Sequence, residues 1–212
     1  MAKAMFNARL DVLPEPEIVP EIVPEIVSET LLAMKVDPVL QWVVALGLAV
    51  LFVAAAWHKR ASPKHFAAQL AAYDLVPRRV LQPVATALPW IELATALGLL
   101  IVPLRPLAGA SAAVLLSTYA LGMAVNLLRG RRDIDCGCGG SAQPLAWGLV
   151  LRNVTLVVGA TSLVLPTAAR AIAVGDLVLM GVLLALLCLT YTAVGQVVRN
   201  AAALRGWSAH ES

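Results

Sequence analysis

Charged residues are scarce in this chain. Asp, Glu, Lys and Arg together make up 14% of its 212 residues, while 60% of the residues are hydrophobic. A soluble domain of this size needs a larger charged surface, so the composition argues against a soluble globular protein. The formal net charge of +3 is small, and the basic residues flank apolar segments instead of lining one face. This is not the pattern of a nucleic-acid-binding surface, and no nucleic-acid partner is expected.

Cysteine is scarce as well, with three residues in the whole chain. This number rules out a disulfide-rich scaffold, which needs several pairs. Two of the three stand close together in the segment Cys136-Gly137-Cys138-Gly139-Gly140. The third, Cys188, lies inside an apolar segment and is expected to be a buried, inert thiol.

An early apolar run is missing too, so no signal peptide is predicted, and the first transmembrane helix is expected to act as the insertion signal.

What the chain does contain is a series of apolar segments. They cover approximately residues 39–57, 80–102, 107–128, 145–165 and 174–198. Each is close to the roughly 20 residues that a helix needs to cross a bilayer, and a helix satisfies its own backbone hydrogen bonds in lipid. We therefore predict an all-α fold, an integral membrane bundle of four to five transmembrane helices over residues 38–200. Between the first two segments, Ser62-Pro63 favours the start of a short amphipathic helix at the membrane interface.

The two ends of the chain differ from the bundle in composition. Residues 1–37 contain three consecutive Pro-Glu-Ile-Val repeats. A proline at every fourth position forbids a continuous helix, so a disordered low-complexity tail is predicted. A strand-like docking segment for a partner is the alternative, and Met34 is an alternative start of the protein. Residues 201–212 are predicted to form a short polar tail.

Basic residues near the apolar segments predict the orientation. Lys35, Arg105 and Arg170 lie near the ends that the predicted topology places on one side of the membrane. The opposite side carries Lys59, Arg60, Lys64, Arg78, Arg79, Arg129, Arg131, Arg132, Arg199 and Arg205. Because the more basic side faces the cytoplasm, we expect a multi-pass protein of the cell (inner) membrane with its amino terminus outside and its carboxyl terminus in the cytoplasm. The cysteine pair is then at the cytoplasmic end.

Cys136 and Cys138 are the candidate catalytic residues. A thiolate is the reactive form of cysteine, and nearby cations favour it; here they are Arg129, Arg131 and Arg132. In an extended chain the two Cα atoms would lie roughly 6.6–7.2 Å apart, at the upper limit for a disulfide, so only a compact turn allows the bond. Such a bond is expected to be easily reduced and suited to passing electrons.

Two other interpretations of the cysteine segment stay open. The cysteines could be incidental to a glycine-rich turn, or they could bind a metal. Zinc usually takes four ligands, and the segment offers two sulfurs. The nearest further candidates are Asp133, Asp135, His58 and His65. No metal site is assigned from these residues.

Among the polar residues within the apolar segments, four are candidates for a functional role: Glu92, Asn126, Arg152 and Asn153. A charge near mid-membrane costs about 2.5–3.5 kcal/mol on insertion scales, so such residues tend to be functional. Asn126, Arg152 and Asn153 are predicted to line a cavity beneath the cysteine loop. Glu92 is expected either to pair with Arg152 or to stay protonated as a proton relay. Interhelical hydrogen bonds that merely hold the bundle together are the alternative.

Several sequence segments together resemble a known family. They are Phe66, Tyr73 and Pro77, then Leu88-Pro89-Trp90-Ile91-Glu92-Leu93, then Asn126-Leu127-Leu128-Arg129-Gly130-Arg131-Arg132-Asp133-Ile134-Asp135-Cys136-Gly137-Cys138, and then Leu151-Arg152-Asn153. This arrangement is similar to the MauE family, membrane proteins of methylamine utilisation related to the DoxX-like membrane proteins. The resemblance covers roughly residues 39–165. Gly139 departs from it, since the family often has an aromatic residue there.

The resemblance implies a role in maturing the disulfide-rich, periplasmic small subunit of methylamine dehydrogenase. A thioredoxin-like partner, MauD, is implied as well, with Cys136 and Cys138 as the redox pair of a membrane thiol–disulfide oxidoreductase component. No cofactor is certain, and quinone is a candidate because related membrane proteins connect thiols to quinones. A non-enzymatic scaffold or chaperone and a metal-handling protein are the alternatives. A periplasmic substrate conflicts with cysteines at the cytoplasmic end, unless electrons cross the bundle or the loop folds back toward mid-membrane.

Overall fold

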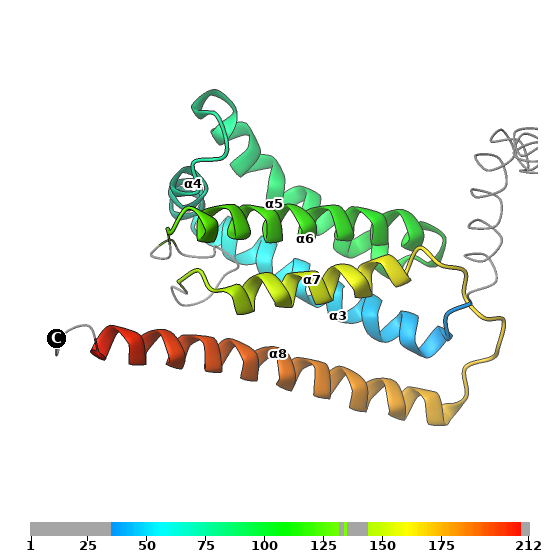
Figure 1. The fold of residues 1–212 in the computed structure, drawn as a ribbon. Coiled ribbons are helices and arrows are strands. Elements are labelled where there is room, and N and C mark those ends of the chain that lie inside the picture. Colours follow the sequence, from blue (N-terminus) through cyan, green and yellow to red (C-terminus); the bar gives the residue numbers. More distant parts are fainter. Residues whose placement is uncertain (1–34, 132–133, 135–143, 209–212) are drawn as a thin grey trace, which may run out of the picture. The chain divides into compact units, whose positions relative to one another are not determined.

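The computed structural model describes residues 35–131, 134 and 144–208. Residues 36–212 form one compact unit, and every described helix belongs to it. Most of the predicted tail over residues 1–37, together with Arg132, Cys136 and Cys138, lies outside the described residues. The elements, shown in Figure 1, are α3 (Pro38–Ala61), α4 (Pro63–Ala72), α5 (Arg78–Leu100), the 3-10 turn η1 (Val102–Leu104), α6 (Arg105–Leu128), α7 (Trp147–Ser162) and α8 (Val174–Ser208).

Four helical segments are long and apolar enough to cross a membrane. They are Pro38–Ala61, Arg78–Leu100, Val102–Leu128 and Val174–Val197. Helix α7 has 16 residues, which gives a length of about 24 Å at 1.5 Å per residue, less than the roughly 30 Å of a hydrocarbon core. The prediction of an all-α membrane bundle with four to five spans is therefore confirmed.

The outer surface of α6 shows why a membrane is needed. Large apolar side chains recur there at intervals of seven residues, and Leu107, Val114, Leu121 and Leu128 are all at least 65% exposed. A contiguous apolar stripe of this kind is unfavourable in water and marks a surface that another phase covers. Lipid covers it at no such penalty, because the acyl chains are as apolar as leucine.

The core lies where α3 meets α5, α6 and α7. Helix α3 buries Ala45, Leu48, Ala49, Phe52 and Ala56 at spacings of one, three and four residues, which places them on one face. Small residues allow the close approach of α6 and α7. A Cβ added at Gly109 would lie 2.9 Å from Leu163 Cβ and 3.0 Å from Ala160 O.

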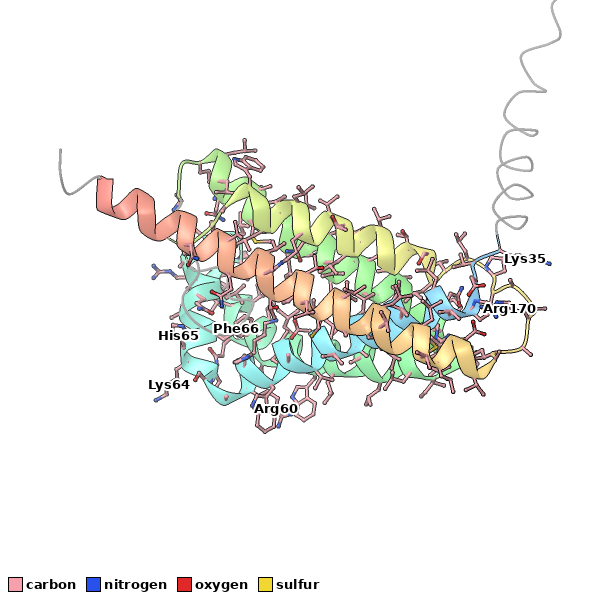
Figure 2. All side chains as sticks on the ribbon, turned by 90° about the horizontal axis from the view of Figure 1, so that it is seen from below. Lys35, Arg60, Lys64, His65, Phe66 and Arg170 are labelled. Atoms are coloured by element: carbon pink, nitrogen blue, oxygen red, sulfur yellow. The ribbon has the colours of Figure 1, made fainter. Side chains whose placement is uncertain are left out.

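The predicted interfacial helix is present as α4. Pro63 stands in its first turn, and Phe66 is its one buried residue. Beyond its end, Asp74 has a left-handed backbone with φ of 52°. Figure 2 places Arg60, Lys64 and His65 at one end of the bundle and Arg170 at the opposite end.

Helix α8 is the least covered element. It packs mainly against α3, and it continues to Ser208, into the predicted polar tail. Cys188 is an exposed free cysteine on this helix, so the prediction of a buried thiol was wrong. Its apolar surroundings in the sequence correctly indicated a lipid-crossing helix, but the outer surface of such a helix is as apolar as its packed face.

The end of the bundle that carries Arg170 is closed by polar contacts. Val36 N donates to Pro166 O at 3.0 Å and Ala168 N donates to Val36 O at 2.9 Å. The Arg170 guanidinium contacts the carboxylates of Asp37 and Asp176, each at 2.8 Å. Its hydrogen bonds, followed by that from the Val39 N–H, hold the pKa of Asp37 below its ordinary value. These contacts join the starts of α3 and α8.

Candidate functional site

The cysteine segment begins where α6 ends. Leu128 is the last residue of α6, and Gly130 has a left-handed backbone with φ of 76°. Glycine adopts this conformation without steric penalty and commonly ends helices in this way. Gly130 N donates to Leu127 O at 3.0 Å and Arg131 N donates to Asn126 O at 3.0 Å. The chain therefore leaves α6 in a defined direction.

The base of the cysteine segment is closed. Leu145 N donates to Ile134 O at 3.1 Å, which brings together the chain on either side of the segment. Ile134 packs against a cluster of Met123, Leu127, Leu145 and Leu149 at the junction of α6 and α7. Cys136 and Cys138 themselves fall outside the described residues. The structure thus describes the residues on either side of the cysteine segment, Ile134 and Leu145, and the apolar cluster that they join.

Two of the predicted supporting residues at this end contact each other, since Arg131 Nη1 donates to Asn126 Oδ1 at 3.5 Å. Arg129 and Arg131 are exposed. Asn126 is fully buried and donates from Nδ2 to Tyr73 O and to Gly122 O, each at 3.1 Å. Since Tyr73 is the C-cap residue of α4, Asn126 joins the end of α4 to the start of the cysteine segment.

Arg152 and Asn153 lie next to each other on α7 but face different groups. The Arg152 guanidinium lies 4.8 Å from the centre of the Tyr191 ring on α8. Asn153 is buried and donates to Leu149 O in its own helix at 2.9 Å. Among the described residues, no hydrogen bond joins either of them to Asn126, so a cavity shared by the three stays a prediction.

Glu92 does not pair with Arg152, and that prediction was wrong. Its partner is Lys59, whose Nζ forms an ion pair with Glu92 Oε1. Tyr119 OH donates to the same oxygen at 2.6 Å. The reason is geometric: Lys59 continues the buried face of α3 that includes Phe52 and Ala55, while Arg152 is turned toward α8.

These three side chains form the Lys59–Glu92–Tyr119 cluster, which joins α3, α5 and α6. Glu92 is 0% exposed and Lys59 is 6% exposed. The Lys59 ammonium also lies 4.9 Å from the centre of the Tyr119 ring and 5.3 Å from that of the Phe66 ring of α4. Aromatic faces attract a cation, so the ring of Phe66 links α4 to the buried charge.

Lys59 and Tyr119 were missed as site residues in the sequence. Lys59 belongs to the basic run His58-Lys59-Arg60, which was interpreted only as a flank of the first span. The helical spacing held a better signal, because Lys59 follows Phe52 by seven residues and Ala55 by four and so lies on their face. Its neighbour Arg60 is exposed and stacks 4.0 Å from the centre of the Trp90 ring.

The described site contains hydrogen-bond donors, Lys59 and Tyr119, around the carboxyl group of Glu92. Within residues 35–131, 134 and 144–208, no group of three His, Cys, Asp or Glu side chains could hold a metal ion. His65, one of the candidates for a metal ligand, lies 3.0 Å from Gln69 Nε2 through its own Nε2.

Comparisons with known proteins identify the family of this chain. The family model of methylamine utilisation protein MauE matches residues 37–166, which include the core helices and the cysteine segment. Methylamine utilization protein MauE of Paracoccus denitrificans is 42% identical over 123 residues, 57% of this chain and 66% of the relative. The protein of that name from Methylophilus methylotrophus is 41% identical over 102 residues, 48% of this chain and 54% of the relative.

A third relative extends the match. MauE of Methylorubrum extorquens is 36% identical over 145 residues, 66% of this chain and 78% of the relative. The match thus spans less than two thirds of the length of the first two relatives. No solved structure matches the chain. With a family model that covers more than half of its residues, the chain belongs to the family of methylamine utilisation protein MauE.

Proposed function

We propose that this protein acts in methylamine utilisation, as a membrane protein that matures the small subunit of methylamine dehydrogenase by disulfide formation. Its membership of the MauE family and its transmembrane bundle support the cellular role.

The proposed chemistry is thiol–disulfide exchange at Cys136 and Cys138. A substrate thiolate attacks the Cys136–Cys138 disulfide and forms a mixed disulfide, releasing one cysteine as a thiolate. The second substrate thiolate then displaces the other cysteine. The substrate gains a disulfide, and the pair takes up two electrons and two protons as two thiols. A thioredoxin-like partner in its disulfide form reoxidises the pair by the same exchange, and a quinone is a candidate for the acceptor beyond it.

The observation that best supports this chemistry is the closed base of the cysteine segment. The hydrogen bond from Leu145 N to Ile134 O and the buried residues Met123 and Leu149 beneath it support a loop that starts and ends at one place. Arg129 and Arg131, exposed at its start, provide the positive charge that favours a thiolate. A loop held at its base at one end of the bundle would be accessible to a thioredoxin-like partner.

We further propose that the protein lies in the cytoplasmic membrane with the cysteine segment at the cytoplasmic end. Because the small subunit is expected to be periplasmic, the exchange with Cys136 and Cys138 then precedes its export. The exposed cations Arg60, Lys64, Arg78 and Arg129 support this orientation through the positive-inside rule. A membrane-impermeant thiol reagent applied to intact cells tests it. Protection of Cys136 and Cys138 from the reagent is expected, and rapid labelling would place the loop on the outer side.

A complementation experiment tests the function. A methylamine-utilising host that lacks its own MauE would receive the wild-type chain, the variant Cys136→Ser/Cys138→Ser, or the control Cys188→Ala. Growth on methylamine and the disulfide state of the dehydrogenase small subunit would be measured. Wild type and the Cys188 control are expected to restore both, and the double serine variant neither.

The same experiment distinguishes thiol–disulfide exchange from the alternative of a non-enzymatic scaffold. A membrane scaffold that only holds the subunit would work without either sulfur. Full maturation with Cys136→Ser/Cys138→Ser, at normal protein levels in the membrane, would therefore contradict thiol–disulfide exchange while leaving the role in methylamine utilisation intact.

A further inference from the structure

The Lys59–Glu92–Tyr119 cluster contains a carboxylate that is only half hydrogen-bonded. Lys59 Nζ and Tyr119 OH both donate to Glu92 Oε1. Glu92 Oε2 is buried and accepts a hydrogen bond from no residue in the described part of the chain. An ionised carboxylate offers about four acceptor positions, and a buried polar atom left unpaired costs about 1–3 kcal/mol. The fold therefore presents one reactive oxygen of a buried acid that its neighbours leave open.

We propose that Glu92 Oε2 is a reversible proton-binding site, and that proton uptake releases Lys59 from Glu92. A proton is a ligand that needs no cavity, and it converts the unpaired acceptor into a carboxylic acid. The step adds one proton to the carboxylate and breaks no covalent bond. It changes the charge of the cluster from zero to plus one, which removes the attraction that holds the Lys59 ammonium inside.

Lys59 has a short way out of the bundle. It lies in the last turn of α3, between the exposed residues His58 and Arg60. A lysine side chain can extend along apolar surface until its ammonium reaches the membrane interface. The released charge thus moves to the basic end, where Figure 2 shows Arg60 and Lys64, and only the neutral acid stays buried.

The groups that face Glu92 are known for each element packed around it. Helix α3 contributes Lys59 and α6 contributes Tyr119. Helix α4 contributes the uncharged Phe66 ring, over which the Lys59 ammonium lies. The charged and titratable residues of α4, Lys64 and His65, are exposed at the surface. The site is accordingly governed by one cation and one phenol.

Proton uptake has a structural consequence because α4 is held at two points. Phe66, near its start, lies against Lys59, and Tyr73, at its end, accepts the hydrogen bond from Asn126. When Lys59 leaves, α4 loses the charge beneath its one buried side chain and loosens at that point. Helix α4 thus connects the proton site with Asn126, near the end of α6 from which the chain continues to the cysteine segment. The proton site itself is independent of whether the cysteines exchange disulfides.

Infrared difference spectroscopy of the full chain in lipid nanodiscs tests proton binding. The chain contains one Glu between residues 38 and 200, so labelling glutamate with carbon-13 distinguishes Glu92 from every Asp in the bundle. Six further Glu residues lie outside this range and give bands of their own, so the signal of Glu92 is the difference between the wild type and Glu92→Gln. On acidification, this difference is expected to contain a label-shifted carbonyl band of a carboxylic acid. The same label-shifted bands in both proteins, at every pH at which they stay folded, would overturn the proposal.

A second variant keeps the test decisive if Glu92→Gln does not fold. Tyr119→Phe removes one donor to the ionised carboxylate but keeps the ring beneath Lys59. The midpoint of the acid band should then differ from that of the wild type, and an unchanged midpoint would contradict the assignment. The matched control is Arg170→Gln, at the opposite end of the bundle, which should leave the midpoint unchanged.

Hydrogen–deuterium exchange tests the release of α4. After correction for the intrinsic pH dependence of exchange, amides of residues 63–72 are expected to be less protected in the acid form than in the ionised form of the wild type. In Glu92→Gln the ion pair cannot form, so protection should be low and the same at both pH values. Equal protection of α4 in both wild-type forms would overturn the release of α4.

Discussion

Breaking the Lys59–Glu92 ion pair should strongly destabilise the bundle. The variant Lys59→Met keeps the length of the side chain and removes its charge. The carboxylate of Glu92, which is 0% exposed, then has no cation beside it. Removing one partner of a buried pair costs about 3–5 kcal/mol. By contrast, an interhelical hydrogen bond in a membrane bundle contributes about 0.6 kcal/mol on average. The ionic effect should therefore dominate, and we expect Lys59→Met to lower the free energy of unfolding by about 3 kcal/mol.

A double-mutant cycle separates the charge from the packing. In Lys59→Met/Glu92→Gln both charges are gone, and buried pairs replaced by uncharged residues often lose little stability. We expect this variant to be more stable than Lys59→Met, with a coupling of about 2 kcal/mol, within the range for residues in contact. Unfolding by sodium dodecyl sulfate in mixed micelles, followed by circular dichroism, measures all the variants.

The neighbouring residue gives the matched control. Arg60→Met removes an exposed cation that stacks on Trp90, which should cost about 0.5–1 kcal/mol. Equal losses for Lys59→Met and Arg60→Met, or strictly additive effects of Lys59→Met and Glu92→Gln, would refute the claim that the ion pair holds α3 and α5 together.

Two further predictions concern packing and acid stability. Gly109→Ala should destabilise the bundle by about 1–3 kcal/mol, because the new Cβ would lie 2.9 Å from Leu163 Cβ. In the control Gly181→Ala the new Cβ would have no atom within 4 Å, so this variant should be neutral or stabilising in the same unfolding assay. Equal effects of the two substitutions would contradict the close packing of α6 and α7. Asp37 has its pKa lowered from 3.8, so its contribution to stability is present above that pH and is lost as pH falls through the folded-state value. Melting temperatures at a series of pH values should show this acid-side loss in wild type and less of it in Asp37→Asn, whereas identical profiles would contradict a stabilising ion pair with Arg170.

The fold could be predicted from the sequence because lipid imposes simple requirements. Apolar segments near 20 residues long must be helices, and those segments became α3, α5, α6 and α8. Ser62-Pro63 likewise marked the start of α4. Helix length was harder to predict for α7, where the apolar segment 145–165 contains a helix of only 16 residues.

The candidate site could be predicted only in part because pairing depends on how helices are rotated and staggered. The sequence identified Glu92 as exceptional, but its partner had to be chosen among several cations. Arg152 was chosen for its position within a span, whereas Lys59 looked like an interfacial flank. Only the packed structure shows that the buried face of α3 extends to Lys59 and that Arg152 faces Tyr191. Exposure of Cys188 has the same origin, since the sequence of an apolar helix does not say which face its neighbours cover.

The central claim is that Cys136 and Cys138 form a reversible redox pair, and thiol counting tests it most directly. Because Cys188 is an exposed free cysteine, it would react as well, so the Cys188→Ala variant is equilibrated in buffers of graded reduction potential. The free thiols are then alkylated and counted by mass spectrometry. Two alkylated cysteines in reducing buffer and none in oxidising buffer, with one midpoint for both and no dimer formed, are the expected result. Two free thiols at every potential would contradict the account.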